Sequence, residues 1–306
     1  MKLGVIGGAG LLGATTAFNV AAKGIVEEII LYDLRENMAI SHAMDIDQGV
    51  SETTGTKVIA GSFDDLKDCN IILNTAGIPE KKVASRAEAL GENVKIFEDI
   101  ASKIKAWETS PIILTASNPV DPLNYILYKA MEGSPLRNIG FSRNDSLRFR
   151  WSIALETGLP VSEIEAYAIA EHGDNQVPLF STVKRTDTGE PLVFTDVQKQ
   201  NILERVKNWF ANYQKLDSGR SSGWTSGIGL AKIIEMFTID SDNSEILSCS
   251  VIPGNAYGLS DLSIGLPVRL GTEGVKEIIH LDLSDQEKEG LFIAAEKIKN
   301  MITQDK

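Results

Sequence analysis

Short apolar segments alternate with longer segments of mixed polarity along the first half of the chain. The apolar segments contain few polar side chains, which is typical of strands buried on both faces of a parallel sheet; they are 2–6, 28–33, 70–74 and 112–116. Helical patterns separate them, and the first runs from 14 to 23 before Gly24, a residue type that commonly ends a helix. This order predicts an α/β fold built on a doubly wound parallel sheet.

The second half of the chain has a different pattern. Rough alternation over 163–170 predicts a strand that leads into His172. Two helical segments and one strand-like segment follow, at about 195–213, 226–236 and 245–252. From about residue 284 the apolar positions fall on one face of a closing helix. We therefore expect a mixed α+β domain over 143–306, after a parallel-sheet domain over 1–142.

A glycine-rich loop joins the first predicted strand to the first helix. It follows the pattern Gly-x-Gly-x-x-Gly through Gly8, Gly10 and Gly13, with Leu11 and Leu12 between the last two glycines. Such a loop lets the backbone approach a pyrophosphate, which then faces the N–H groups of the helix start. Asp33 ends the second strand twenty residues after Gly13, where a carboxylate binds ribose hydroxyls and repels a 2′-phosphate. This context favours a Rossmann-type NAD-binding domain over a glycine turn without a ligand, and NAD over NADP.

One of only three histidines, His172, lies in the segment Glu171-His172-Gly173-Asp174 at the end of a predicted strand. An imidazole can give and take a proton near neutral pH, provided that a carboxylate fixes its tautomer. Asp145 is our candidate for that carboxylate. The alternatives are a buried structural histidine and an aspartate that caps a helix.

Two arginines and an asparagine complete the candidate chemistry. Arg148 follows Asp145 by three residues, so both lie on one helical face, and its guanidinium suits the binding of a carboxylate. Arg86 ends a polar stretch that resembles a closing loop and could polarise a carbonyl group. Asn118, in Ser117-Asn118-Pro119, could bind a nicotinamide or a substrate oxygen. The alternatives are a surface ion pair, a solvated charge and a simple turn.

Composition limits the partners and the compartment. The net charge of −12 argues against nucleic acids and anionic membranes, although a few local arginines can still bind an anionic substrate. No apolar run is long enough to span a bilayer, and a predicted strand that starts at Lys2 leads us to expect no secretory signal. Cys69 and Cys249 show no metal or redox spacing, so we expect a reducing cytoplasm and no bound metal.

Taken together, these residues resemble the L-lactate/L-malate dehydrogenase family over nearly the whole chain. The matching stretches are Gly8–Gly13, Asp33, Thr75–Pro79, Ser85-Arg86, Ser117–Pro119, Asp145–Arg148, Glu171–Asp174 and Tyr257–Asp261. The resemblance implies hydride transfer between NAD and a small L-2-hydroxy or 2-oxo acid. It implies that His172 exchanges the proton, that Asp145 is its partner, that Arg148 binds the carboxylate and that Arg86 polarises the carbonyl. It also implies that the cofactor is contacted by Ala76, Gly77 and Asn118.

Three positions depart from the family's usual residues or bear on the substrate. Aligned without a gap, Glu80 stands where malate enzymes have arginine and lactate enzymes have glutamine, and a carboxylate there should repel the second carboxylate of oxaloacetate. A shifted loop could instead present Lys81 or Lys82 and restore malate. Asn144 replaces an aliphatic residue and hints at a more polar substrate, and Thr225 looks more like the lactate branch.

We therefore expect a lactate-type or broader 2-hydroxyacid dehydrogenase, with malate dehydrogenase as the alternative. An NAD-dependent glycoside hydrolase and an NAD-binding scaffold whose catalysis has faded are more remote alternatives. Members of the family are usually homodimers or homotetramers, and we expect one of these here.

Overall fold

The computed structural model describes residues 1–78, 86–219, 222–240 and 244–303. Its first half alternates strands with helices: β1 (Lys2–Ile6), α1 (Leu11–Ala22), β2 (Glu28–Tyr32), α2 (Glu36–Val50), β3 (Lys57–Ala60), β4 (Ile71–Asn74), α3 (Arg86–Lys105), β5 (Ile112–Thr115), α4 (Val120–Met131) and β6 (Asn138–Gly140). The six strands pair in parallel in the order β3-β2-β1-β4-β5-β6. The predicted doubly wound parallel sheet is confirmed.

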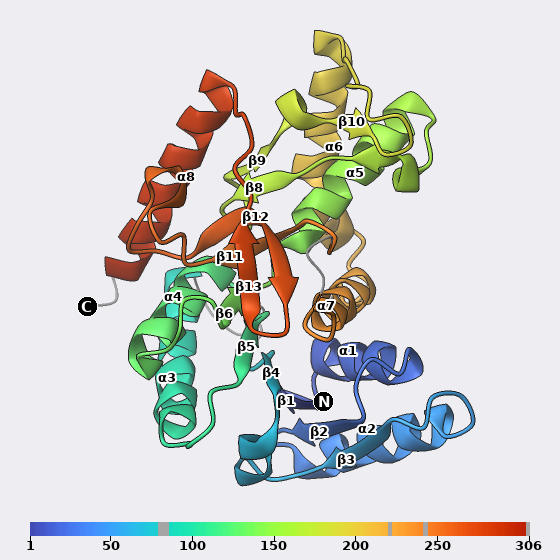
Figure 1. Cartoon of the computed structure of the whole chain (residues 1–306), viewed down its shortest axis with the longest axis vertical. Helices are drawn as coiled ribbons and strands as arrows, with labels where there is room; N and C mark the ends of the chain where they lie inside the picture. Colours follow the sequence, from blue (N-terminus) through green and yellow to red (C-terminus); the bar gives the residue numbers. More distant parts are fainter. Residues whose placement is uncertain (79–85, 220–221, 241–243, 304–306) are drawn as a thin grey trace.

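The second half continues the same sheet with antiparallel strands. Its elements are α5 (Arg143–Thr157), β7 (Ile164–Glu165), β8 (Ala168–Ala170), β9 (Gln176–Pro178), β10 (Lys184–Arg185), α6 (Asp196–Lys215), α7 (Trp224–Met236), β11 (Leu247–Val251), β12 (Ile264–Gly271), β13 (Gly274–Ile278) and α8 (Asp285–Thr303). β11 pairs with β6 and carries the sheet on to β12, β8 and β9 (Figure 1). The two halves therefore share one sheet, and the chain passes from one to the other between β6 and α5. The division at 142/143 into two domains stays a prediction.

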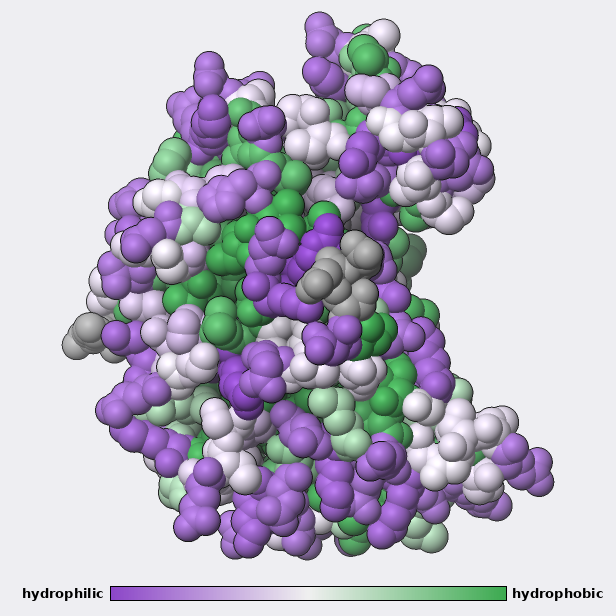
Figure 2. Space-filling view, viewed as in Figure 1, coloured by the Kyte–Doolittle hydropathy of each residue, from purple (hydrophilic) through white to green (hydrophobic). Residues whose placement is uncertain are grey.

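Helices cover both faces of the parallel strands because each strand is apolar on both faces. Successive residues of β4 illustrate this: Ile71 and Leu73 join the apolar cluster that includes α1, whereas Ile72 joins the one that includes α3 and α4. A third apolar cluster lies between α5 and α6, which project beside the sheet (Figure 1). On the face shown in Figure 2, hydrophilic side chains gather along the rim, including the edge formed by α2 and β3, whereas hydrophobic residues show in the middle.

One local expectation is wrong, and two strands were missed. The strand predicted over 163–170 is broken into β7 and β8 at Ala166 and Tyr167, because β7 pairs with β10 outside the main sheet whereas β8 pairs within it. The strands β12 and β13 were not expected, since Gly265 and Pro267 interrupt the apolar pattern of β12. None of the described helices has the length and apolar character needed to cross a membrane.

Helices α1 and α7 approach each other closely, which brings the second half against the glycine-rich loop (Figure 1). A Cβ atom at Gly227 of α7 would lie 2.5 Å from the side-chain Cγ2 of Thr15 in α1. Real Cβ atoms do not come so close, so the glycine is what permits this approach.

We expect Gly227→Ala to lower the free energy of unfolding by about 1–3 kcal/mol, because the added methyl group must displace Thr15. Gly49→Ala, in α2, is the matched control, since a Cβ there meets no atom within 4 Å. We expect it to raise the free energy of unfolding by at most about 1 kcal/mol through helix propensity. Chemical denaturation measures both, and equal midpoints would contradict the close packing of α1 on α7.

Candidate active site

The glycine-rich loop between β1 and α1 is packed so tightly that side chains are excluded from it. Gly7 has a φ of +87°, and its N–H and that of Gly8 both donate to the carbonyl oxygen of Tyr32 at 2.9 Å. A Cβ at Gly13 would lie 2.4 Å from the carbonyl oxygen of Gly7, and one at Gly8 would lie 2.9 Å from Cβ of Leu31. The glycines at these motif positions are therefore required by the fold of the loop itself.

The helix that follows the loop has no side-chain cap. Gly10 is the N-cap of α1, Leu11 and Leu12 open its first turn, and no acidic residue lies there. Helix geometry leaves the first N–H groups without intrahelical acceptors, and the helix dipole makes this end partly positive. A Cβ at Gly10 would meet only the Gly7 carbonyl within 4 Å, at 3.2 Å. This end of α1 therefore suits the close approach of a pyrophosphate.

Asp33, at the end of β2, is held beside this loop. Its Oδ2 accepts a hydrogen bond from the backbone N–H of Ala9 at 3.0 Å, and its Oδ1 accepts one from that of Arg35 at 2.9 Å. Directly after it, a surface hollow of about 500 Å³ is lined by Leu34, Arg35, Glu36, Asn37 and Met38. The Asp33 carboxylate has further lone pairs that can accept hydrogen bonds from hydroxyl groups. This fits the contact with ribose hydroxyls that the sequence predicts.

Asn93 of α3 joins two further loops, the one that follows β4 and the one that follows β5. It is not among the site residues predicted from the sequence. Its Oδ1 accepts from the backbone N–H of Ile78 at 2.8 Å, and its Nδ2 donates to the carbonyl oxygen of Asn118 at 3.1 Å. Ser117 Oγ also donates to the carbonyl oxygen of Ala76 at 2.6 Å. Asn118 and Gly77 are exposed at this junction, and a cis peptide bond joins Asn118 to Pro119. Nothing in the local sequence marks Asn93, which is one asparagine among many polar helix residues.

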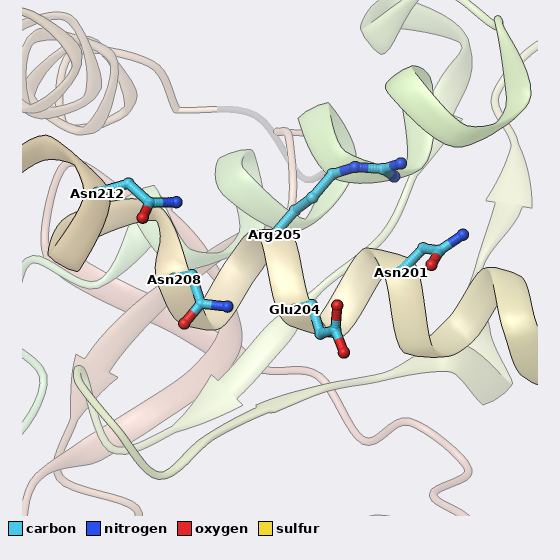
Figure 3. A pocket seen from close by; sticks show the side chains of 5 residues that line it. All are labelled: Asn201, Glu204, Arg205, Asn208 and Asn212. Atoms are coloured by element: carbon cyan, nitrogen blue, oxygen red, sulfur yellow. The ribbon is translucent and has the colours of Figure 1, made fainter.

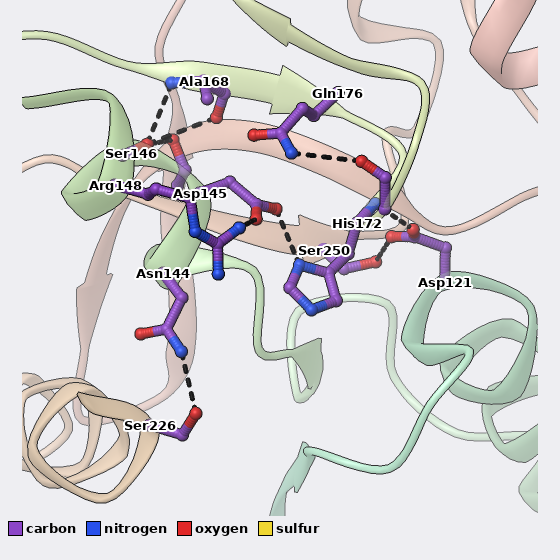
Figure 4. Close-up of polar contacts among 12 residues, drawn as sticks. Asp121, Asn144, Asp145, Ser146, Arg148, Ala168, His172, Gln176, Ser226 and Ser250 are labelled. Atoms are coloured by element: carbon purple, nitrogen blue, oxygen red, sulfur yellow. Dashed lines mark hydrogen bonds and ion pairs between the residues drawn. The ribbon is translucent and has the colours of Figure 1, made fainter. Parts of the chain in front are cut away.

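The predicted acid/base pair is in direct contact (Figure 4). His172 Nδ1 lies 2.6 Å from Asp145 Oδ2, and Arg148 Nη1 lies 3.5 Å from the other oxygen, Asp145 Oδ1. Because a carboxylate accepts, Nδ1 carries the hydrogen, and Nε2 is the ring nitrogen that remains for a substrate. The i, i+3 spacing on α5 does bring Arg148 and Asp145 to one face, as predicted.

Charge and burial act in opposite directions on His172. Burial by itself lowers the pKa of the imidazole, but the charge and hydrogen bond of Asp145 and the charge of Asp121 offset this and raise the pKa above its usual value. Burial likewise lowers the pKa of the Arg148 guanidinium, against the charge of Asp145. His172 is thus arranged to hold a proton to higher pH than a free histidine.

Asp121, near the start of α4, holds the backbone of His172 from behind. Its Oδ2 accepts from the His172 backbone N–H at 2.7 Å, and its Oδ1 accepts from Ser250 Oγ of β11 at 2.5 Å. The side chain is fully buried, and burial raises its pKa to about 7. Asp121 is not among the site residues predicted from the sequence, although an acid next to apolar Val120 at a helix start is a usable signal.

Two residues proposed for substrate binding sit where α5 meets α7. Asn144 is almost fully buried, and its Nδ2 donates to Ser226 Oγ at 2.8 Å (Figure 4). Thr225 precedes that serine and is half-buried. The Nδ2 of Asn144 thus has a partner within the protein, whereas its buried Oδ1 has no hydrogen-bond partner among the described residues. The helix-cap alternative for Asp145 is wrong, because Ser142 is the N-cap and Asp145 lies in the first turn of α5.

Two other predicted residues are not placed with this group. Glu80 lies outside the described residues. Arg86 is the first residue of α3 rather than part of a loop, and its side chain also lies outside the described part of the structure. Within the ranges that are described, no group of three or more His, Cys, Asp or Glu side chains is arranged to hold a metal ion.

Comparison with known proteins gives one consistent result. Residues 1–140 match the family model described as lactate/malate dehydrogenase, NAD binding domain, and residues 143–306 match that of the alpha/beta C-terminal domain. A malate dehydrogenase of Haloarcula marismortui is 35% identical over 98% of this chain and 97% of its own length.

Solved structures agree with these sequence matches. The minor L-lactate dehydrogenase of Enterococcus mundtii superposes with a TM-score of 0.91 at 25% identity, covering 99% of this chain and 98% of its own. The malate dehydrogenase of Salinibacter ruber gives 0.88 at 30% identity, covering 100% and 97%. Together with the glycine-rich loop and the contact between His172 and Asp145, these matches show that the chain belongs to the lactate/malate dehydrogenase family, whose members transfer a hydride between NAD and a small 2-hydroxy or 2-oxo acid.

Proposed function

We propose that this dehydrogenase acts on lactate-type or a broader range of L-2-hydroxy acids, through His172, Asp145 and Arg148. The observation that carries this proposal is the contact of all three side chains, with His172 and Arg148 on different oxygens of one carboxylate. The arrangement leaves an imidazole nitrogen and several guanidinium N–H groups for a single small ligand. A 2-oxo acid has the matching groups, a carbonyl oxygen next to a carboxylate.

Each residue has a defined task in the proposed reaction. Bound NADH supplies the hydride for the carbon of the 2-oxo group. His172 donates the proton from Nε2 to the oxygen of that group, and Asp145 stabilises the protonated imidazole before the transfer. Arg148 binds the substrate carboxylate with its in-plane N–H groups. Arg86 polarises the carbonyl oxygen. In the reverse direction His172 removes the proton of the 2-hydroxy group.

The cofactor is proposed to bind along the parallel half of the sheet, in the domain 1–142. The backbone at Gly8, Gly10 and Gly13, with Leu11 and Leu12 at the helix start, fits the pyrophosphate because no side chain obstructs it. Asp33 binds the ribose. The two loops joined by Asn93, which carry Ala76, Gly77 and Asn118, contact the nicotinamide end of the cofactor. This end faces the domain 143–306.

The choice of acid rests on Glu80, Asn144 and Thr225. A carboxylate at residue 80 favours an acid without a second negative charge, which supports lactate-type substrates over malate. The malate alternative requires Lys81 or Lys82 to replace it. Relatives with both names match this chain, so the comparisons support each to the same degree.

A homodimer or homotetramer is proposed because α1, α2 and α7 expose large apolar side chains: Phe18 is 51% exposed, Met44 is 69% and Ile228 is 52%. Helix α1 packs against both of the others. Exposed apolar groups on adjoining elements commonly mark a subunit interface. The two free, buried cysteines Cys69 and Cys249 support a cytoplasmic location.

The more remote alternatives have less support. The matched relatives are dehydrogenases, which speaks against a glycoside hydrolase. An NAD-binding scaffold without catalysis would not need the His172–Asp145 contact at 2.6 Å, with Arg148 beside it. Turnover of any 2-oxo acid with NADH separates an active enzyme from such a scaffold.

The first prediction from the proposed function concerns pH. Reduction of a 2-oxo acid needs protonated His172, so we expect kcat/KM to be full below the pKa of His172 and to fall as pH rises through it. In the native protein this fall should occur above the usual pKa of histidine, because Asp145 and Asp121 raise it. Asp145→Asn removes the charge of the nearer carboxylate. We expect the fall to move to lower pH and kcat/KM to drop by about 10²–10⁴-fold.

A pH profile of 2-oxo acid reduction, recorded for both proteins with saturating NADH, measures this effect. Glu171→Gln is the control, since among the described residues this neighbouring acid forms no hydrogen bond or ion pair with the His172 ring; its carboxylate accepts from Asn175 instead. An unchanged profile in Asp145→Asn would remove Asp145 from the proposed role.

The second prediction concerns the substrate. At 4 Å and an effective dielectric constant of 20, two like charges repel by about 4 kcal/mol. We expect Glu80→Arg to raise the ratio of kcat/KM for oxaloacetate over pyruvate by about 10²–10³-fold, and Glu80→Gln to raise it less. Initial rates against a panel of 2-oxo acids measure these ratios. If native protein prefers oxaloacetate, the specificity role of Glu80 is wrong and malate is the substrate.

The third prediction concerns the cofactor. Asp33→Asn keeps the shape of the side chain but removes the charge that repels a 2′-phosphate, and it frees the exposed Arg35, whose Nε lies 3.4 Å from Asp33 Oδ1. We expect the ratio of kcat/KM for NADPH over NADH to rise by about 10–100-fold. Glu36→Gln, a neighbouring exposed acid, is the control and should leave the ratio unchanged. If the ratio of kcat/KM for NADPH over NADH is the same in Asp33→Asn and Glu36→Gln, the ribose does not bind at Asp33.

A further inference from the structure

An aromatic side chain from another helix covers the guanidinium of Arg148. The central carbon of this guanidinium lies 4.7 Å from the ring centroid of Trp209 in α6. Arg148 is otherwise only loosely held, since its hydrogen bond to Asp145 is 3.5 Å long and that carboxylate is closer to His172. The aromatic ring is therefore a second contact that holds the guanidinium, in addition to Asp145.

The contact follows from the antiparallel packing of α5 and α6. One turn farther along α5, the carbonyl oxygen of Ser152 lies 3.5 Å from Nη1 of Arg205, and one turn beyond that, Glu156 forms an ion pair with Arg205 at 2.6 Å. Glu156 also accepts from Asn201 at 3.1 Å. Figure 3 shows Arg205 extending from α6 toward α5, whereas Glu204 and Asn208 point to the other side. This register places Trp209 opposite Arg148.

The position of Trp209 on α6 is also fixed by its own neighbours. Ile202 and Val206 are buried against α5, and Trp209 and Tyr213 continue the same stripe at helical spacing. The Trp209 and Tyr213 rings stack at 5.5 Å with an angle of 11° between their planes. Trp209 is thus held on one side by a second ring, and it lies on the face of α6 that packs against α5, so it presents a fixed face to Arg148.

We propose that Trp209 is a positioning residue for Arg148, which fixes the guanidinium plane so that its edge faces the substrate carboxylate. This inference rests on the proposed role of Arg148. All five N–H groups of a guanidinium lie in its plane, so a ring on one face takes none of them away. The negative face of the indole also offsets part of the cost of burying the charge. We expect loss of the indole face to weaken the binding of substrates and to leave the binding of the cofactor unchanged.

The experiment compares three variants of the full-length protein with the native enzyme. Trp209→Leu removes the aromatic face, and Trp209→Phe keeps a smaller one. Trp151→Leu is the matched control, because Trp151 lies on α5, is 41% exposed and has no ring or cation contact among the described residues. The probes are NADH alone, oxamate with NADH as an isosteric analogue of pyruvate, and the best 2-oxo acid of the panel.

We expect Trp209→Leu to raise the Kd of oxamate and the KM of the 2-oxo acid by about 3–30-fold, with a smaller effect on kcat. The Kd of NADH should stay within about 2-fold. Trp209→Phe should recover part of the loss, and Trp151→Leu should match native protein. Addition of oxamate should also change the Trp209 fluorescence, a signal that is lost in Trp209→Leu but kept in Trp151→Leu.

Two results would overturn the role of Trp209 and leave the proposed function intact. One is native oxamate affinity in Trp209→Leu. The other is a parallel loss of oxamate binding, NADH binding and thermal stability with no recovery in Trp209→Phe, which would show a packing role only. A native protein that binds NADH but neither binds oxamate nor reduces any 2-oxo acid would instead overturn the proposed function, and the role of Trp209 with it.

Discussion

The buried carboxylate of Asp121 joins the two halves of the sheet at the point where the proposed chemistry takes place. It belongs to the first half through α4, and it holds the backbone of His172 and the hydroxyl of Ser250, which belong to the second. Burying a carboxylate costs several kcal/mol unless hydrogen bonds compensate, so removing either partner leaves an expensive group unsatisfied. The Asp121 side chain therefore links the backbone of His172 to the loop of Asn118, which lies three residues before Asp121.

A second constraint is that the charged groups of the site are arranged in one turn of α5. Asp145 and Arg148 follow each other at i, i+3, and the two oxygens of Asp145 are divided between His172 and Arg148. The carboxylate raises the pKa of the imidazole and also partly neutralises the arginine. In the proposed mechanism, one helix position thus influences both proton transfer and substrate binding, which is why changes at Asp145 should affect both.

Features that depend on neighbours in the sequence could be predicted, and those that depend on distant pairing could not. The glycine-rich loop, Asp33 and the spacing of Asp145 and Arg148 are local, and the structure places them as the sequence indicates. Asp121 and Asn93 act on residues far along the chain, and Trp209 meets Arg148 only because α5 and α6 pack in one register. The same limit explains the broken strand at Ala166, where the strand partners change, and the partner of Asn144, which comes from α7.

A chain with a net charge of −12 that binds an anionic acid must place its few cations where the acid goes. For Arg148, which we propose as the residue that binds the acid, the distances indicate how this is done. Asp145 lies 2.6 Å from His172 but 3.5 Å from Arg148, so its carboxylate interacts more strongly with the imidazole than with the guanidinium. An aromatic face then supports the arginine without consuming its donors, whereas a second acid in its place would compete with the substrate. In the role that we propose for Trp209, support by a ring rather than by a carboxylate keeps the guanidinium both fixed and available, and the packing of α6 would then be part of substrate recognition.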